Sequence, residues 1–91
     1  MVDSAHGVYA ISVAASMVSM EIQNLRVYER RGLVDPERTD GGTRLYSDAD
    51  ITRLRRIAAL LEDGLNLAGI ALVLELEADN ARLRRRLDRR R

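Results

Sequence analysis

The segment from Met20 to Gly32 (MEIQNLRVYERRG) constrains this chain most, because it reads as one short helix with a polar outer surface. At about 3.6 residues per turn, Ile22, Leu25 and Glu29 fall on one side, so the helix has only a thin apolar seam. The other positions are Glu21, Gln23, Asn24 and Val27, flanked by Arg26, Tyr28 and Arg30.

Amide side chains can pair with adenine in a major groove, and guanidinium groups can pair with guanine or with phosphate. The polar surface of this helix therefore suits a protein that reads DNA. The alternative is an ordinary solvated helix, and these residues alone do not decide between the two.

Composition excludes several classes of function. The chain of 91 residues has the size of one domain, contains no cysteine, and carries one histidine, His6, near its start. We therefore expect no disulfide, no metal site, no cofactor and no catalytic centre. No apolar run approaches the ~20 residues that span a bilayer, and no basic leader precedes the first apolar residues. A cytoplasmic, nucleoid-associated protein is the simplest expectation.

Charge is unevenly distributed along the chain. All fifteen basic residues are arginine, and seven of them fall in residues 82–91. A basic segment suits phosphate or acidic partners. The alternative is a solubilising helix end, where arginine also complements the helix dipole.

Two short helices are expected in the first third of the chain. Residues 1–8 read as a flexible lead-in, Tyr9–Ile11 as a short extended segment, and Ser12 as the N-cap of a helix of about two turns. Ser19 marks a break, and the helix over residues 20–31 follows and ends at Gly32. This spacing is typical of a helix-turn-helix.

A β-hairpin is predicted next. Pro36 stops any helix, and the turn Asp40-Gly41-Gly42 separates two short segments, residues 37–39 and 43–46. Arg38 and Arg44 lie near its tip and Tyr46 at its foot. As a wing beside a duplex, the hairpin would bring its arginines to phosphates or to the narrow groove; the alternative is a plain linking hairpin.

Two further helices are predicted after the hairpin. Ser47 and Asp50 form a capping-box variant, Gly64 ends the helix that they open, and Asn66 can cap the next. We expect core packing rather than a ligand pocket from their apolar stripes, Ile51, Leu54, Ile57, Ala58 and Leu61 in the first and Leu67, Ile70, Ala71 and Leu74 in the second. On the outer side we expect solvated arginines, Arg53, Arg55 and Arg56.

Heptad spacing begins near residue 73. The a and d positions are Val73, Leu76, Asn80, Leu83 and Leu87. A single asparagine at an a position costs stability but fixes register and partner number, which indicates a two-chain coiled coil. So short a helix is marginal alone, so the preceding helix must contribute. The alternative is a helix that folds back on its own domain.

The order of these elements resembles the MerR family of bacterial transcription regulators. The resemblance rests on RVYERRGLV after the helix-turn-helix, on RTDGGTRLYSDAD over the hairpin, and on the paired helices and coiled-coil segment that follow. Within the family, ISVAA and GLNLAGI look most like the heat-shock repressor (HspR-like) branch. The chain departs from the family pattern at Ser19, where a turn glycine is common, and at Val27, which replaces one tyrosine of a pair.

The resemblance implies a mainly α, winged helix-turn-helix fold that binds a two-fold-related operator as a homodimer. The implied domains are the lead-in over residues 1–8, a DNA-binding domain over residues 9–71, and a dimerisation helix over residues 72–91. The resemblance assigns base reading to Glu21, Gln23 and Asn24, DNA-backbone contacts to Arg26, Tyr28 and the neighbouring Arg30, and wing contacts to Arg38, Arg44 and Tyr46.

Three functions follow as alternatives. The first is a regulator, most simply a repressor, of its own or chaperone operons. The second is an adaptor with a MerR-like fold that binds a J-domain or Hsp70-type chaperone. The third is a small architectural or excisionase-like DNA binder. Salt-sensitive binding to duplex DNA distinguishes the first and third from the second.

Overall fold

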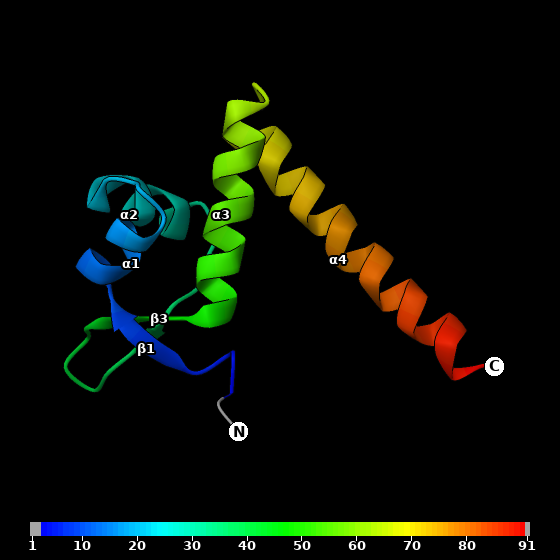
Figure 1. Ribbon diagram of the computed structural model, residues 1–91, viewed down its shortest axis with the longest axis horizontal. Coiled ribbons are helices and arrows are strands. Elements are labelled where there is room, and N and C mark those ends of the chain that lie inside the picture. The colour runs from blue at the N-terminus through cyan, green and yellow to red at the C-terminus, as the bar shows by residue number, and fades with distance from the viewer. Residues whose placement is uncertain (1–2, 91) are drawn as a thin grey trace. The chain divides into compact units, whose positions relative to one another are not determined.

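The computed structural model describes residues 3–90, and the chain divides into two compact units, Met1–Ala59 and Leu60–Arg91 (Figure 1). The first unit holds a small sheet, two short helices and most of a third helix. The second holds the end of that helix and one long helix. The predicted fold class, a mainly α winged helix-turn-helix, is confirmed. Each helix within residues 3–90 is too short or too polar to cross a bilayer.

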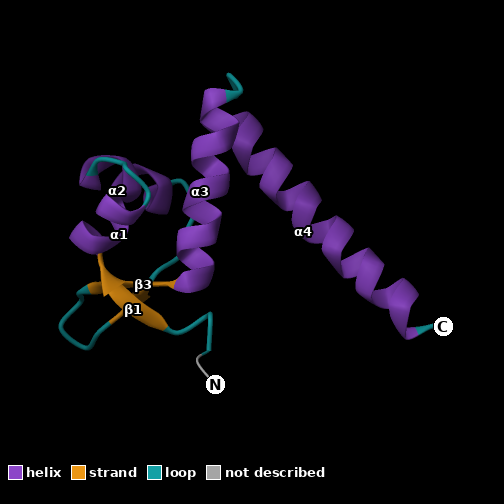
Figure 2. Cartoon of the chain, viewed as in Figure 1, coloured by secondary structure: helices purple, strands orange, loops and turns teal. Residues whose placement is uncertain are grey.

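The sheet has three antiparallel strands in the order β1-β3-β2 (Figure 2). β2 (Glu37–Arg38) and β3 (Arg44–Ser47) form the predicted hairpin. β1 (Gly7–Ala10) pairs along β3; the sequence predicted an extended segment over residues 9–11, but neither its start at Gly7 nor this pairing. The expectation of a flexible lead-in through residue 8 is therefore wrong for residues 7 and 8. Gly7 is required there, because a Cβ at this position would lie 2.5 Å from the carbonyl oxygen of Leu45.

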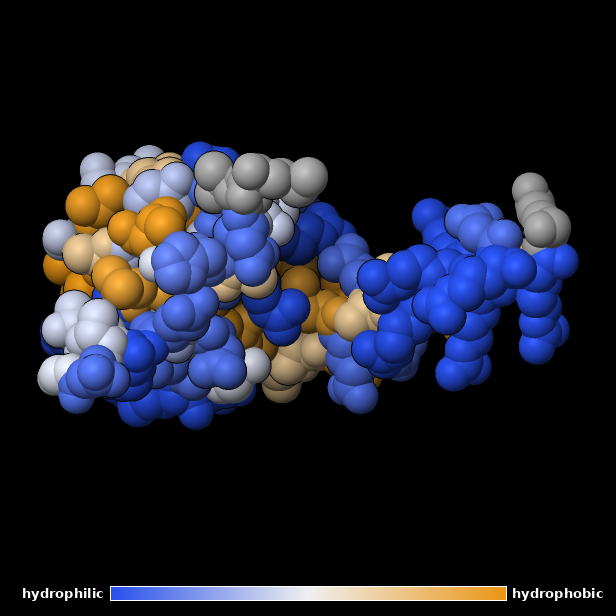
Figure 3. All heavy atoms as spheres, turned by 90° about the horizontal axis from the view of Figure 1, so that it is seen from below, coloured by the Kyte–Doolittle hydropathy of each residue, from blue (hydrophilic) through white to orange (hydrophobic). Residues whose placement is uncertain are grey.

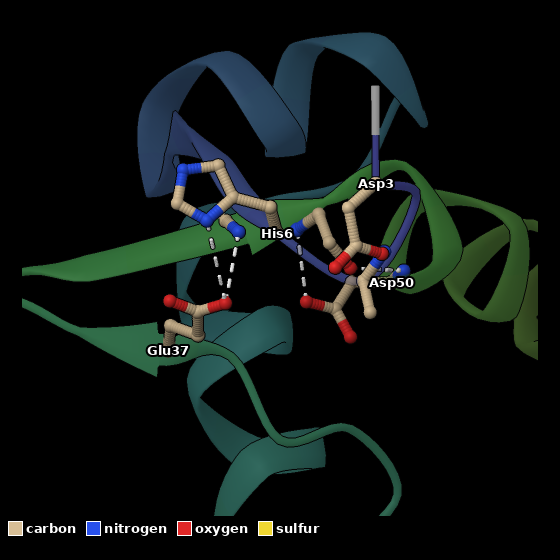
Figure 4. Close-up of polar contacts among 7 residues, drawn as sticks. Asp3, His6, Glu37 and Asp50 are labelled. Atoms are coloured by element: carbon tan, nitrogen blue, oxygen red, sulfur yellow. Dashed lines mark hydrogen bonds and ion pairs between the residues drawn. The ribbon is translucent and has the colours of Figure 1, made fainter. Parts of the chain in front are cut away.

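The segment before β1 is also held in place. The Gly7 N–H donates to Oε1 of Glu37 at 3.1 Å, and the imidazole Nδ1 of His6 lies 3.9 Å from the same oxygen (Figure 4). The Ala49 N–H donates to the carbonyl oxygen of Ser4 at 2.9 Å. Contacts that are remote in sequence thus fix a stretch that local sequence signals mark as loose.

α1 (Ile11–Met17) begins two residues earlier than predicted. Its N-cap is Ala10, and no side chain caps it, so the prediction of Ser12 as N-cap is wrong. The reason is the sheet: Ala10 pairs with Leu45 and has an extended backbone, so strand β1 passes directly into the helix.

α2 (Ile22–Arg30) ends as its sequence predicts. Gly32 has φ +74°, its N–H donates to Glu29 O at 3.0 Å, and the Leu33 N–H donates to Tyr28 O at 2.9 Å. This pair of bonds is a Schellman motif.

α1 ends with the same pair of bonds but without glycine. The Ser19 N–H donates to Ser16 O at 3.3 Å and the Met20 N–H to Ala15 O at 3.0 Å. Ser19 has φ +55°, and it is the only non-glycine residue with positive φ between residues 3 and 90. The turn between α1 and α2 therefore holds a serine in a conformation that favours glycine.

α3 (Asp48–Glu62) opens with the predicted capping box. The Ser47 N–H donates to Asp50 Oδ2 at 2.9 Å, and the Asp50 N–H donates to Ser47 Oγ at 3.0 Å. The prediction that Arg53 is solvated is wrong: its side chain is half-buried and its Nε donates to the carbonyl oxygen of Leu33. That bond ties α3 to the loop after α2.

The core of the first unit combines apolar residues from every helix of that unit with one strand residue. Its central members are Ala14, Leu25, Tyr28, Tyr46, Ile51, Leu54 and Ile57. The predicted inner stripe of α3 is thus confirmed at Ile51, Leu54 and Ile57. It is wrong at Leu61, which is exposed, because the buried position near the helix end is Leu60.

The second unit contains α4 (Leu67–Arg89), which begins as predicted, because Oδ1 of Asn66 accepts from the Gly69 N–H at 2.8 Å. Ile70 and Leu74 are buried, whereas Ala71 is exposed. The expected domain boundary at residue 72 lies inside this continuous helix.

Replacing Ser19 by glycine should stabilise the fold. Glycine removes the steric cost of positive φ but loses more entropy on folding, so we expect a gain of about 0.5–1 kcal/mol in the free energy of unfolding. Chemical denaturation monitored by circular dichroism measures it. Ser16→Gly, inside α1, is the matched control and should lower stability. A lower stability for Ser19→Gly would contradict the account of the turn.

Candidate nucleic-acid interface

The outer surface of α2 carries the side chains expected to read DNA. Gln23, Arg26 and Arg30 are exposed and, at i, i+3 and i+7, share one face of the helix. Asn24 is exposed at the neighbouring edge. Glu21, also exposed, is the N-cap, so the helix begins two residues later than predicted.

The two tyrosines assigned to DNA contacts are buried, which corrects the prediction for both. Tyr46 has an exposed fraction of 0% and Tyr28 of 5%. The chain has no phenylalanine or tryptophan, so its core uses tyrosine rings as its largest apolar groups. Burial raises the pKa of both phenols. The hydroxyl of Tyr46 finds no hydrogen-bond partner within residues 3–90.

Glu29 joins α2 to both strands of the wing, by which we mean Glu37–Ser47. Its Oε2 accepts from Arg38 Nη2 at 2.9 Å, and its Oε1 accepts from Arg44 Nε. Arg38 and Arg44, which were expected to contact DNA from the hairpin, are thus both paired with Glu29. The sequence placed Glu29 on the inner side of its helix but gave no indication of these partners.

The two ion pairs of Glu29, with Arg38 and with Arg44, are together called the bridge. The bridge also offsets a repulsion between charges within the hairpin. Arg38 and Arg44 stand directly opposite each other in the β2–β3 register. Like charges in that arrangement repel. The Glu29 carboxylate, 17% exposed, lies between them as a counterion.

Burial alone would raise the pKa of Glu29, but hydrogen bonds from Arg44 and Arg38 and the charges of both outweigh it and hold that pKa below its usual range. The pKa of Arg44 moves in the opposite direction: its hydrogen bond to Glu29 raises it. At neutral pH the carboxylate is ionised and the bridge is fully charged.

The tip of the wing is held by its own hydrogen bonds. Arg38 Nη1 donates to Gly42 O at 3.0 Å, the Thr39 N–H donates to Thr43 O at 2.9 Å, and the Gly42 N–H donates to Thr39 O at 2.8 Å. Gly42 has φ +85°, as the predicted turn needs. The wing therefore has a defined shape and a fixed attachment to α2.

The residues predicted to form a dimer contact lie along α4. Leu76, Leu83 and Leu87 are 57%, 56% and 61% exposed, and Asn80 is exposed as well. Val73 is half-buried. So much exposed leucine at heptad spacing on one helix is an unsatisfied apolar surface.

Comparison with known proteins identifies the family. The protein family described as 'MerR HTH family regulatory protein' matches residues 9–77 of this chain. The chain belongs to the MerR family. A heat shock protein of the HspR type from Streptomyces coelicolor is 50% identical over 80 residues, which is 87% of this chain and 53% of that protein. The chain thus spans about half the length of this relative.

Solved MerR structures share the fold. The N-terminal part of MtaN, the Bacillus subtilis multidrug transporter activator, is 29% identical, with a TM-score of 0.66 over 89% of each chain. HiNmlR, a MerR regulator without a sensor domain that was solved bound to promoter DNA, is 23% identical, with a TM-score of 0.68 over 88% of this chain and 78% of its own. The latter comparison concerns the fold alone.

Glu29→Gln should lower the stability of the MerR-type domain in a pH-dependent way. The folded pKa of Glu29 lies below its unfolded value, so the charged bridge stabilises the fold above the unfolded pKa and this contribution is lost as pH falls through the folded pKa. At pH 7 we expect a loss of about 1–2 kcal/mol.

Urea denaturation at pH 7 and in stepwise more acidic buffers measures this loss. Glu62→Gln, which removes an exposed carboxylate from α3, is the matched control and should change little. If the difference in the free energy of unfolding between wild type and Glu29→Gln stayed constant as the pH fell, the charged bridge would be contradicted.

Proposed function

We propose that this protein is a transcription regulator that binds duplex DNA by placing α2 in the major groove. The observation that carries the proposal is the exposed α2 face, where Gln23 and Asn24 stand beside Arg26 and Arg30. Amides and guanidiniums on a short exposed helix match the donor and acceptor pattern of base edges and phosphates.

In this proposal the side chains divide into two roles. Gln23 and Asn24, with Glu21 at the start of the helix, contact base edges. Arg26 and Arg30 bind phosphates and fix the register of the helix on the duplex. Arg38 and Arg44 act mainly by holding the wing against α2 through Glu29, with Arg38, whose side chain is 46% exposed, also able to turn toward a phosphate.

The protein acts in this proposal as a homodimer joined through the exposed leucines of α4, and it represses its own or chaperone operons in the cytoplasm. The identity to an HspR-type heat shock protein supports the stress-related target. The heptad spacing of Leu76, Leu83 and Leu87, with Asn80 among them, supports two chains. A dimer of this kind requires a two-fold-related operator.

Removing one base-reading amide tests the proposal. Gln23→Ala or Asn24→Ala should weaken binding to the operator by about 1–3 kcal/mol for each lost bidentate contact and leave binding to random duplex nearly unchanged. Fluorescence anisotropy on both duplexes at one fixed salt concentration measures the two affinities. Equal losses on operator and random DNA would refute base reading by these side chains.

A charge in the leucine seam tests the dimer. Leu83→Asp should convert the protein to a monomer in analytical ultracentrifugation, because a buried carboxylate in the seam would lack a partner. Ala78→Asp, on an exposed part of α4 outside the seam, is the control and should leave the dimer intact. If the wild-type protein already sediments as a monomer, the dimer is excluded.

A further inference from the structure

The last turns of α4 carry four arginines on one face, which the proposed function does not use. Arg82, Arg85, Arg86 and Arg89 follow at i, i+3, i+4 and i+7, so they share a side of the helix, and all four are exposed. They line one shallow groove composed only of arginine side chains. On the face seen in Figure 3, the end of α4 shows almost only hydrophilic side chains. We call these residues the arginine face.

The arginine face is short of negative charge. Within residues 3–90, Asp79 pairs with Arg82, and the other three arginines have no ion-pair partner. Like charges three and four residues apart destabilise a helix. The helix dipole favours cations in the last turn, which accounts for Arg86 and Arg89 but not for Arg85. The folded chain therefore bears a repulsion that a bound anion would relieve.

The arginine face is separate from the leucine seam. At 100° per residue, its centre lies roughly 130° around the helix from the line through Leu76, Leu83 and Leu87. Pairing two copies of α4 through the leucines would leave both arginine faces open. A ligand bound there is thus compatible with a dimer.

We propose that the arginine face binds the phosphate backbone of duplex DNA as a second contact, in addition to α2; this rests on the proposed DNA-binding function. Arg82 and Arg86, like Arg85 and Arg89, are four residues apart, which is a rise of about 6 Å. Phosphates of one strand follow every ~3.4 Å of duplex axis, so two guanidiniums at this spacing can reach different phosphates of the same strand. Arginine also forms paired hydrogen bonds with phosphate oxygens, which lysine cannot do.

A pair of matched double variants of the full chain tests this contact. Arg85→Gln with Arg89→Gln removes two charges from the arginine face, and Arg84→Gln with Arg90→Gln removes two from other sides of the same helix. Gel-shift titrations of random duplex at several salt concentrations should show a slope of log affinity against log salt that is shallower by about 0.9 for each lost phosphate contact in the first variant.

The control double variant should keep the wild-type slope, and Arg85→Lys with Arg89→Lys should keep most of it. Equal slopes for the two glutamine variants would overturn the proposal. It would also be overturned if Arg85→Gln with Arg89→Gln lost binding to poly-glutamate but bound DNA as wild type does, since the arginine face would then bind an acidic protein. Operator preference is measured in the same titrations. If wild type prefers operator but the slopes are equal, only this inference fails; if wild type binds no duplex, both proposals fail.

Discussion

The bridge from Glu29 to Arg38 and Arg44 is the interaction on which the arrangement of the site depends. It joins the last turn of α2 to a hairpin whose strands pair over only a few residues. So small a ribbon is at best marginally stable by itself. Because one carboxylate neutralises two opposed guanidiniums, the wing and α2 are held as a single unit with a fixed mutual orientation.

Local backbone chemistry determines where three of the helices end. The ends of α1, α2 and α3 all use the same two backbone bonds, with Ser19, Gly32 and Gly64 in the left-handed conformation. Two of these positions are glycine, as their sequence predicts. The third explains how a helix-turn-helix forms without the usual turn glycine, since the backbone hydrogen bonds of the motif hold Ser19 at positive φ.

The sequence predicted what depends on neighbouring residues and missed what depends on distant ones. The capping box of Ser47 and Asp50, the Asn66 cap and the hairpin turn are all local and all confirmed. An extended segment was predicted over residues 9–11, but its start at Gly7 and its place in the sheet were missed, because Gly7 pairs with a segment forty residues away. Likewise, no local pattern shows that the guanidinium of Arg53 reaches the carbonyl oxygen of Leu33.

Within the candidate site, exposure predicted from helical periodicity was correct for Gln23, Asn24, Arg26 and Arg30 but not for Tyr28. Tyr46, predicted at the foot of the hairpin, is buried as well. A tyrosine can serve as a phosphate ligand or as a core ring, and its residue type alone does not distinguish them. Because the chain has no phenylalanine or tryptophan, the rings of Tyr28 and Tyr46 are packed in the core. That compositional signal was present in the sequence.

The central claim is that the polar face of α2 reads base edges, and selecting binding sites from a pool of random duplexes tests it most directly. We expect the wild-type dimer to enrich a two-fold-related sequence, and methylation of guanine N7, in the major groove of the half-sites, to block binding. Recovery of no common sequence, or of one whose binding is indifferent to major-groove methylation, would contradict it.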